Sequence, residues 1–191
     1  GANTHNTIVD NEIAYPGAYG IFVGNLRRGF CRGDSTSSDV PSPNAWHDFP
    51  EDQQTVVRSW PISSDHVISN NHIHHVGIIE KHGSGIAFYG VTSPNVTVSH
   101  NLIEHTPRFG IAFLSGFGQV TVEYNKLQYI SEETCDTGGI CANRWYTYEK
   151  DAELCKGNII RNNHIADVIG CGAYGSKAEP GGVDKAGGKI W

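Results

Sequence analysis

A fivefold internal repeat constrains this chain more than any other feature of its sequence. Each segment has a β-branched stretch, an asparagine, an Ile or Leu two residues later, and then a Gly-Ile or Gly-Ala step. The aligned asparagines are Asn11, Asn71, Asn101, Asn125 and Asn163. The position three residues before each asparagine is also apolar throughout, whereas the positions between these columns vary freely. Such a repeat indicates stacked, near-identical structural units.

The repeat unit predicts strands and not helices. It runs over roughly 24 to 30 residues without 3.6-residue periodicity, whereas Val96–Val98 and Val120–Val122 alternate with a period of two. We therefore predict an all-β fold, a right-handed parallel β-helix of about five to six coils. Equivalent residues of successive coils would lie about 4.8 Å apart, so the asparagines would form a ladder that satisfies turn backbone groups.

The domain organisation follows from the same alignment. Residues 1–191 form one β-helix domain, interrupted between the first two repeats by an irregular insertion at 25–62 that is rich in Ser, Pro, Asp and Arg. The first repeat lacks a capping helix, and the final GGKIW resembles the next inward strand. We expect the domain to be part of a longer solenoid, or to be completed by end-to-end self-association or an additional chain.

Composition excludes some classes of partner. The formal net charge is −6, and the 14 Lys and Arg residues form no basic stripe, so we expect no nucleic acid partner. No run of 18 apolar residues exists, so we expect no membrane span. The five cysteines lack zinc-site spacing, and one or two disulfides among them stay open.

Two repeats depart from the common length at the same place. The asparagine and the glycine of the Gly-Ile or Gly-Ala step are nine residues apart in repeats one, three and five, but fourteen apart in repeats two and four. The extra residues fall around 79–82 and 132–136, and the two loops would flank repeat three about 10 Å apart. We predict a cleft there, with carboxylates on both sides and His105 and Arg108 in its floor.

A polar or aromatic column stands four residues after each repeat asparagine. Its members are Tyr15, His75, His105, Tyr129 and Asp167. Such a column can line a sugar groove, because aromatic faces stack on pyranose rings and polar tips bind hydroxyl groups. The alternative is a solvated corner whose rings stack on one another.

The ten histidines raise the question of a metal site. The densest cluster is His72, His74 and His75, but His72 and His74 flank an inward Ile73 and His75 falls in the next corner. Metal sites need three or four converging ligands, so we predict no metal site and no cofactor. The acidic loops would suit Ca²⁺ better than this cluster suits a metal.

Asp136 is the strongest single candidate for chemistry. It lies in an inserted loop before two glycines that permit close approach of a ligand, and Arg144 and Trp145 follow nearby. An acid beside an aromatic residue is typical of sugar hydrolases, because stacking and desolvation act together. The alternative is that Asp136 caps a turn.

Three segments resemble a known family. VSHNLIEHTPRFGI (98–111), CDTGGI (135–140) and GNIIRNNHI (157–165) resemble secreted bacterial right-handed β-helix proteins, with glycoside hydrolase family 141 as the nearest characterised group. The resemblance implies a secreted, periplasmic or cell-surface protein acting on plant cell-wall glycans. It makes Asp136 a catalytic candidate and places a second acid on a later coil, beyond Trp191. Cys141 stands where that family has an aromatic residue.

We therefore predict a glycoside hydrolase that acts on a polysaccharide or oligosaccharide through Asp136 and, within this chain, Glu80. The residues expected to bind substrate are His75, His82, His105, Arg108, Tyr129, Glu133, Arg144 and Trp145. A polysaccharide lyase is one alternative, disfavoured by the few basic residues. The other is a non-catalytic surface, adhesin or filament-forming module.

Overall fold

Three parallel sheets, each made of one strand per coil, build the protein. The structure is a computed structural model that describes residues 4–24, 64–89, 94–114, 118–134, 138–143 and 156–170. The first sheet contains β1 (Thr7–Val9), β4 (Val67–Ser69), β7 (Val96–Ser99), β10 (Val120–Glu123) and β13 (Ile159–Arg161). The second contains β2 (Glu12–Ala14), β5 (His72–His74), β8 (Leu102–Thr106), β11 (Lys126–Ile130) and β14 (His164–Ile165). The third contains β3 (Ile21–Gly24), β6 (Ile86–Tyr89), β9 (Phe109–Leu114) and β12 (Gly138–Asn143).

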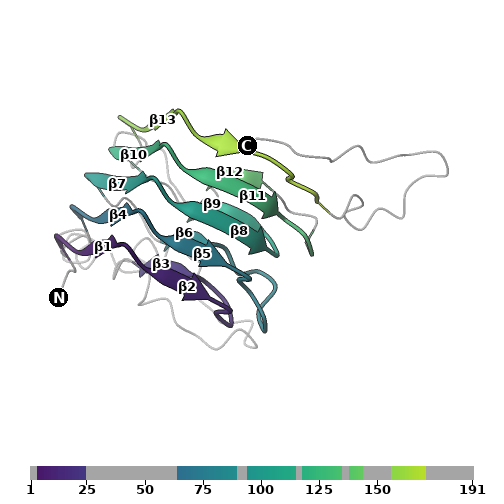
Figure 1. Cartoon of the computed structure of the whole chain (residues 1–191). Coiled ribbons are helices and arrows are strands. Elements are labelled where there is room, and N and C mark those ends of the chain that lie inside the picture. The colour runs from purple at the N-terminus through teal and green to yellow at the C-terminus, as the bar shows by residue number, and fades with distance from the viewer. Residues whose placement is uncertain are drawn as a thin grey trace, which may run out of the picture.

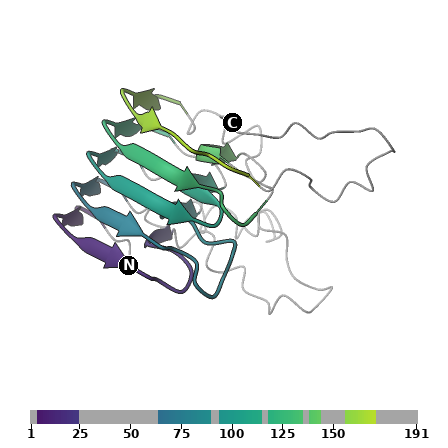
Figure 2. The same ribbon diagram turned by 45° about the vertical axis from the view of Figure 1, so that its right-hand side comes forward.

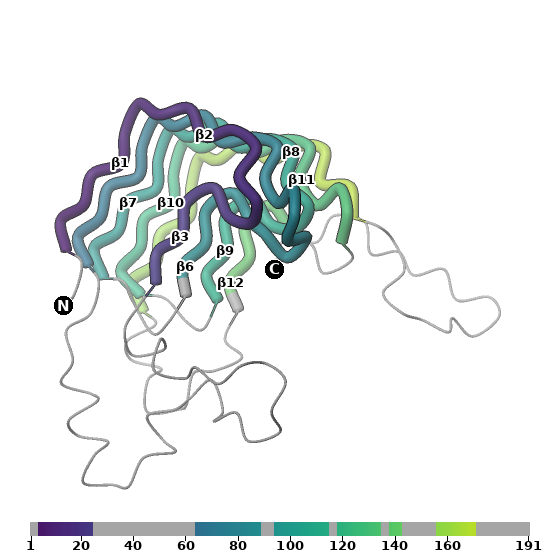
Figure 3. Tube along the Cα trace, turned by 90° about the horizontal axis from the view of Figure 1, so that it is seen from below, coloured from purple at the N-terminus to yellow at the C-terminus, as the bar shows by residue number. Residues whose placement is uncertain are grey.

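The chain visits the three sheets in turn and then begins again one level higher. Figures 1 and 2 show the resulting stack of five coils, which rises from β1 to β13. Seen along the stack, equivalent strands lie one behind another (Figure 3). Every pairing between named strands is parallel and keeps the repeat in register, as in Ile8 with Ile68 and Ile68 with Val98. The predicted parallel β-helix is confirmed.

The two apolar columns of the repeat form the core. In coils two to four, both columns are fully buried: Ile68, Val98 and Val122 from the first sheet, and Ile73, Ile103 and Leu127 from the second. The third sheet adds Ile86 and Ile111, and the stacked pair Phe88 and Phe113, whose ring centroids are 4.8 Å apart. Inward side chains alternate with outward ones along each strand, because successive residues point to opposite faces of a sheet.

The predicted asparagine ladder runs through the corner between the first and second sheets. The side-chain amide of each ladder asparagine donates to Oδ1 of the next, at 2.9 Å in all four steps from Asn11 to Asn163. The backbone N–H of each also donates to the same Oδ1, at 3.0 to 3.1 Å. The ladder therefore satisfies backbone groups that the turn leaves without strand partners.

The same amides also bind carbonyls of the coil below. Asn101 Nδ2 donates to the Ile68 carbonyl at 3.0 Å, and Asn71, Asn125 and Asn163 make the equivalent bonds. The residue just before each ladder asparagine has a positive φ, from 54° to 60°. This left-handed turn directs the chain from the first sheet into the second, and the asparagine holds it there.

A glycine column marks the entry to the third sheet. Gly20, Gly85, Gly110 and Gly139 occupy equivalent positions directly before or within β3, β6, β9 and β12. A Cβ at Gly110 would lie 2.4 Å from Leu127 Cδ2 and 2.7 Å from the Gly139 carbonyl oxygen. The glycines are therefore required by close approach of the neighbouring coil, since a carbonyl cannot move aside as a side chain can.

We predict that Asn101→Ala costs about 2–4 kcal/mol of unfolding free energy, because it removes partners from several buried polar groups. Asn101 is 1% exposed and bonds to the coils on both sides. The matched control is Asn11→Ala, at the exposed end of the described ladder, where a loss of about 1 kcal/mol is expected. Urea denaturation of both variants measures the difference. Equal losses would show that the ladder does not support the coils.

A second prediction concerns the glycine column. Gly110→Ala is expected to destabilise the fold by about 1–3 kcal/mol or more, because its Cβ meets backbone of the next coil. Gly17→Ala is the control, since its Cβ would lie 3.5 Å from Ile79 in ordinary contact and should change stability little. Thermal unfolding compares the two. A neutral Gly110→Ala would contradict this packing of the third sheet.

Candidate functional site

The corner after the second sheet carries a stack of rings, here called the ring ladder: Tyr15, His75, His105 and Tyr129. Successive ring centroids are 4.8, 4.6 and 4.8 Å apart, with interplanar angles of 30°, 27° and 11°. All four residues have positive φ, between 51° and 57°. The shared backbone conformation repeats each Cβ direction from coil to coil, so the rings meet face to face at the coil spacing.

The stacking limits which parts of these rings a ligand can reach. The faces of His75 and His105 are each covered by neighbouring rings, so their edges and polar atoms are what a ligand can reach. Tyr15 is 61% exposed and Tyr129 39% exposed. The sequence left two alternatives, a sugar groove or mutually stacked rings. The structure shows the stacked rings, with an exposed edge that stays compatible with hydroxyl binding.

The two inserted loops follow the ring ladder on coils two and four. The loop of coil two is held on coil one, where the Pro16 carbonyl accepts from Gly77 N and the Gly17 carbonyl accepts from Glu80 N at 2.8 Å. The loop of coil four is held on coil three, where the Pro107 carbonyl accepts from Glu133 N at 3.2 Å. Each loop thus rests on the coil below it, and both rise at the same corner.

Side chains of the two loops meet across coil three. Lys81 Nζ lies 2.9 Å from Glu133 Oε1, an ion pair between residues 52 positions apart. Glu80 Oε1 accepts a bond from the backbone N–H of His82, so this carboxylate caps its own loop. His105 Nδ1 lies 3.3 Å from both carboxylate oxygens of Glu132, which ties the ring ladder to the second loop. The predicted cleft between the two loops is therefore crossed by the Lys81–Glu133 ion pair.

Of the predicted site residues that the structure describes, three share the ring ladder, and the others lie on the inserted loops or on coil three. His75, His105 and Tyr129 share the ring ladder, and Glu133 pairs with the first loop. His82 is exposed beside Glu80. Arg108 is half-buried on coil three, with its guanidinium carbon 4.6 Å from the centre of the Phe109 ring. Asp136, Arg144 and Trp145 lie outside the described residues.

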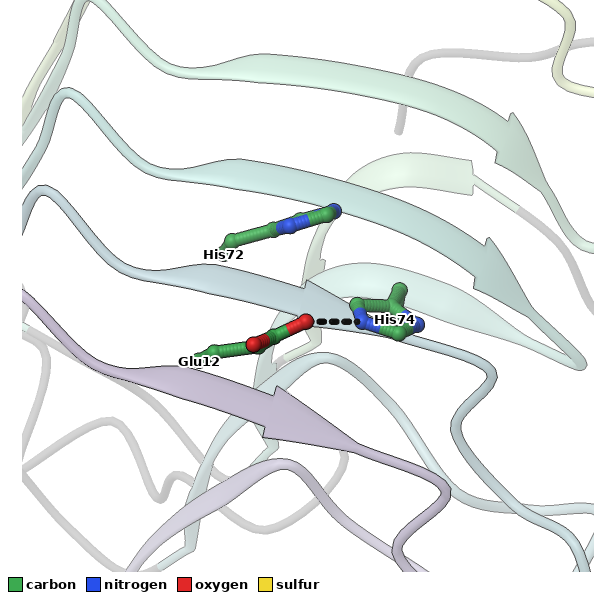
Figure 4. Close-up of side chains that lie close together, drawn as sticks. All are labelled: Glu12, His72 and His74. Atoms are coloured by element: carbon green, nitrogen blue, oxygen red, sulfur yellow. Dashed lines mark hydrogen bonds and ion pairs between the residues drawn. The ribbon is translucent and has the colours of Figure 1, made fainter.

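The histidine cluster noted in the sequence has a third polar member that the sequence argument did not include, and it lies on the outer face of the second sheet. Glu12 of β2 lies beside His72 and His74 of β5, and one potential ligand atom from each lies within 4.8 Å of the other two (Figure 4). The member that the sequence argument did not include is Glu12, which pairs in register with His72. The signal was present in the alignment, because Glu12 and His72 both follow a ladder asparagine directly.

A recess of about 240 Å³ lies between coils one and two, away from both clusters. It is lined by Asn6, Ile8, Phe22, Val23, Gly24, His66 and Ile68. His66 is 3% exposed, and its Nδ1 lies 3.3 Å from both nitrogens of Asn6. It occupies the inward column that Val96 and Val120 continue in the next coils. Burial lowers the pKa of His66 below its usual 6.5, and the nearby Asp65 only partly opposes this.

His66 therefore links stability to pH. A depressed folded pKa means that the unfolded chain binds this proton more tightly, so the stabilisation is full above about pH 6.5 and is lost as pH falls toward the folded pKa. We predict that the melting temperature falls less for His66→Val, which extends the valine column, than for wild type when the pH is lowered from about 7.5 to about 5. His164→Val, at an exposed histidine, is the control. Identical pH profiles for wild type and His66→Val would contradict this assignment.

Comparison with known proteins gives one match. A family model described as a right handed beta helix region matches residues 1–127, more than half of the chain. No curated protein matches significantly, and no solved structure does either. No helix that could cross a bilayer occurs in the part of the chain that the structure describes.

Proposed function

Because the chain belongs to the family of right-handed β-helix regions, we propose that it is a carbohydrate-active protein, a glycoside hydrolase acting on an extracellular polysaccharide. The fold by itself does not select an activity, so the proposal depends on the loop corner of coils two to four. A secreted, periplasmic or cell-surface location belongs to the same proposal, because that is where such polysaccharides occur.

One observation carries the proposal: two equivalent insertions meet across coil three beside the ring ladder. The contact is the Lys81–Glu133 ion pair, and around it stand the carboxylates of Glu80 and Glu132. An exposed ion pair of this kind contributes only about 0–1 kcal/mol, so this contact adds little to the stability of the fold. A corner dense in carboxylates and ring edges is suited to binding sugar hydroxyl groups.

The proposed roles combine the described positions with the sequence assignments. Ring-ladder edges and His82 bind hydroxyl groups, and Arg108 and Glu133 orient the chain of sugars. Arg144 and Trp145, which lie outside the described residues, are assigned to substrate binding from the sequence. Asp136 and Glu80 act as the pair of carboxylates, one protonating the leaving oxygen and the other assisting attack. The finer form of the proposal is activity on plant cell-wall glycans, as in glycoside hydrolase family 141. It rests on the resemblance of the CDTGGI segment.

The test measures release of reducing ends from a panel of plant cell-wall polysaccharides. Asp136→Asn and Glu80→Gln keep the side-chain shapes and remove the charge, and each is expected to reduce kcat at least about 10²-fold. Asp10→Asn makes the same chemical change at an exposed turn on another corner, and should leave turnover unchanged.

Other outcomes overturn parts of the proposal. Near-normal turnover by Asp136→Asn would make Asp136 a turn residue. Glycan binding without turnover would replace hydrolysis with a non-catalytic binding module. New reducing ends accompanied by unsaturated sugar products would indicate a lyase, because elimination leaves a double bond where hydrolysis does not. Filaments that form with rising concentration, without binding of any glycan, would favour a structural role.

A further inference from the structure

The outer face of the second sheet holds a compact cluster of histidines and carboxylates. The outward positions lie one and three residues after each ladder asparagine. Coils one to three place Glu12, His72, His74 and Glu104 at neighbouring positions there. The remaining outward positions of coils one and three are Ala14 and Leu102, which carry no polar side-chain group.

Two contacts define the geometry of the cluster. Glu12 Oε1 lies 3.3 Å from His74 Nε2, and His72 Nε2 lies 2.9 Å from Glu104 Oε2. One potential ligand atom from each of Glu12, His72 and His74 lies within 4.8 Å of the other two. Ligands about 2.0–2.1 Å from a tetrahedral ion are about 3.3 Å apart, so small side-chain rotations would bring these atoms to bonding distance.

We propose that Glu12, His72 and His74 form a zinc site on the outer face of the second sheet, with a water molecule as the fourth ligand. Two imidazole nitrogens and one carboxylate oxygen are a donor set that Zn²⁺ accepts readily. Ca²⁺ and Mg²⁺ are disfavoured, because they prefer all-oxygen coordination with more ligands. The site is separate from the inserted loops and does not depend on glycan hydrolysis.

The surroundings of both histidines already restrict their motion. The side chain of His74 is 14% exposed, and its ring packs edge-on against Tyr15 at 5.7 Å. His74 Nδ1 lies 2.8 Å from His75 Nδ1, so one of these nitrogens donates to the other. With Nε2 of His74 on the metal, its Nδ1–H donates to His75, the kind of outer contact that orients metal-binding histidines.

Glu104 supports His72 in the same way. Its carboxylate accepts from His72 Nε2 and is also contacted by the Gln128 amide. A negative charge next to the histidines favours a cation, and the contact holds the imidazole of His72 in place.

Zinc binding would join two coils that are distant in the sequence. Glu12 belongs to coil one, whereas His72 and His74 lie 60 or more positions later in coil two. The metal would therefore hold the first coil on the second, and a ligand that binds only the folded state raises its stability. We infer a stabilising role for the ion at this junction.

Calorimetric titration of the metal-free chain with Zn²⁺ tests the proposal. We expect binding of one ion per chain and a rise in melting temperature. His74→Ala and Glu12→Gln should each weaken binding at least about tenfold and reduce that rise. Glu12 has a side chain that is 72% exposed, so Glu12→Gln leaves the fold intact and keeps the test valid even where a histidine variant unfolds.

The matched control is His164→Ala. His164 is an exposed histidine in the same outward column as His72, but its neighbour there is Lys126, so the variant should bind zinc as wild type does. The proposal is overturned by the absence of zinc binding, or by binding that Glu12→Gln and His74→Ala leave unchanged. Equal weakening by His164→Ala would likewise overturn it, because it would indicate diffuse binding to surface histidines. None of these outcomes requires glycan turnover, so they are independent of the proposed hydrolase activity.

Discussion

The ladder asparagines of coils two to four each connect three levels of the solenoid through one side chain. Asn101 accepts from the backbone and side-chain amides of Asn71, donates to Asn125 and also bonds the Ile68 carbonyl below. A slip of one residue would break this set and turn the apolar columns outward, because side chains alternate along a strand. The ladder therefore keeps the five coils in one register, and this register also aligns the equivalent residues of every other column.

At the surface, the same alignment places the four rings of the ring ladder face to face. A left-handed conformation costs roughly 1–2 kcal/mol for a residue with a side chain. Stacking of neighbouring rings contributes about 0.5–1.5 kcal/mol per pair, so the three pairs of the ring ladder offset part of this cost. The same corner carries both inserted loops, so the proposed glycan surface lies beside the ring ladder. The proposed zinc site lies on the face of the second sheet, just before this corner, and the contact of His74 with His75 connects the two.

Much of this architecture could be predicted from residue spacing. The asparagine and apolar columns predicted the parallel β-helix, and the spacings of nine and fourteen residues located the two loops. Contacts between side chains could not be predicted in the same way. Glu12 and His72 are neighbours only through the ladder register, and the Lys81–Glu133 contact depends on how each loop settles on the coil below it. Residue spacing carries no information about such loop paths or about rotamers.

The repeat by itself determined the fold class, the buried columns and the position of the exposed corner, because these depend only on periodicity and on the pleat of a strand. Only the tertiary structure decided which polar groups meet. It stacked the rings of His75 and His105 on each other, joined the loops through Lys81 and Glu133, and brought Glu12 to His74. The physical reason is that a coil aligns residues that are 24 to 60 positions apart, and side-chain contacts form between coils.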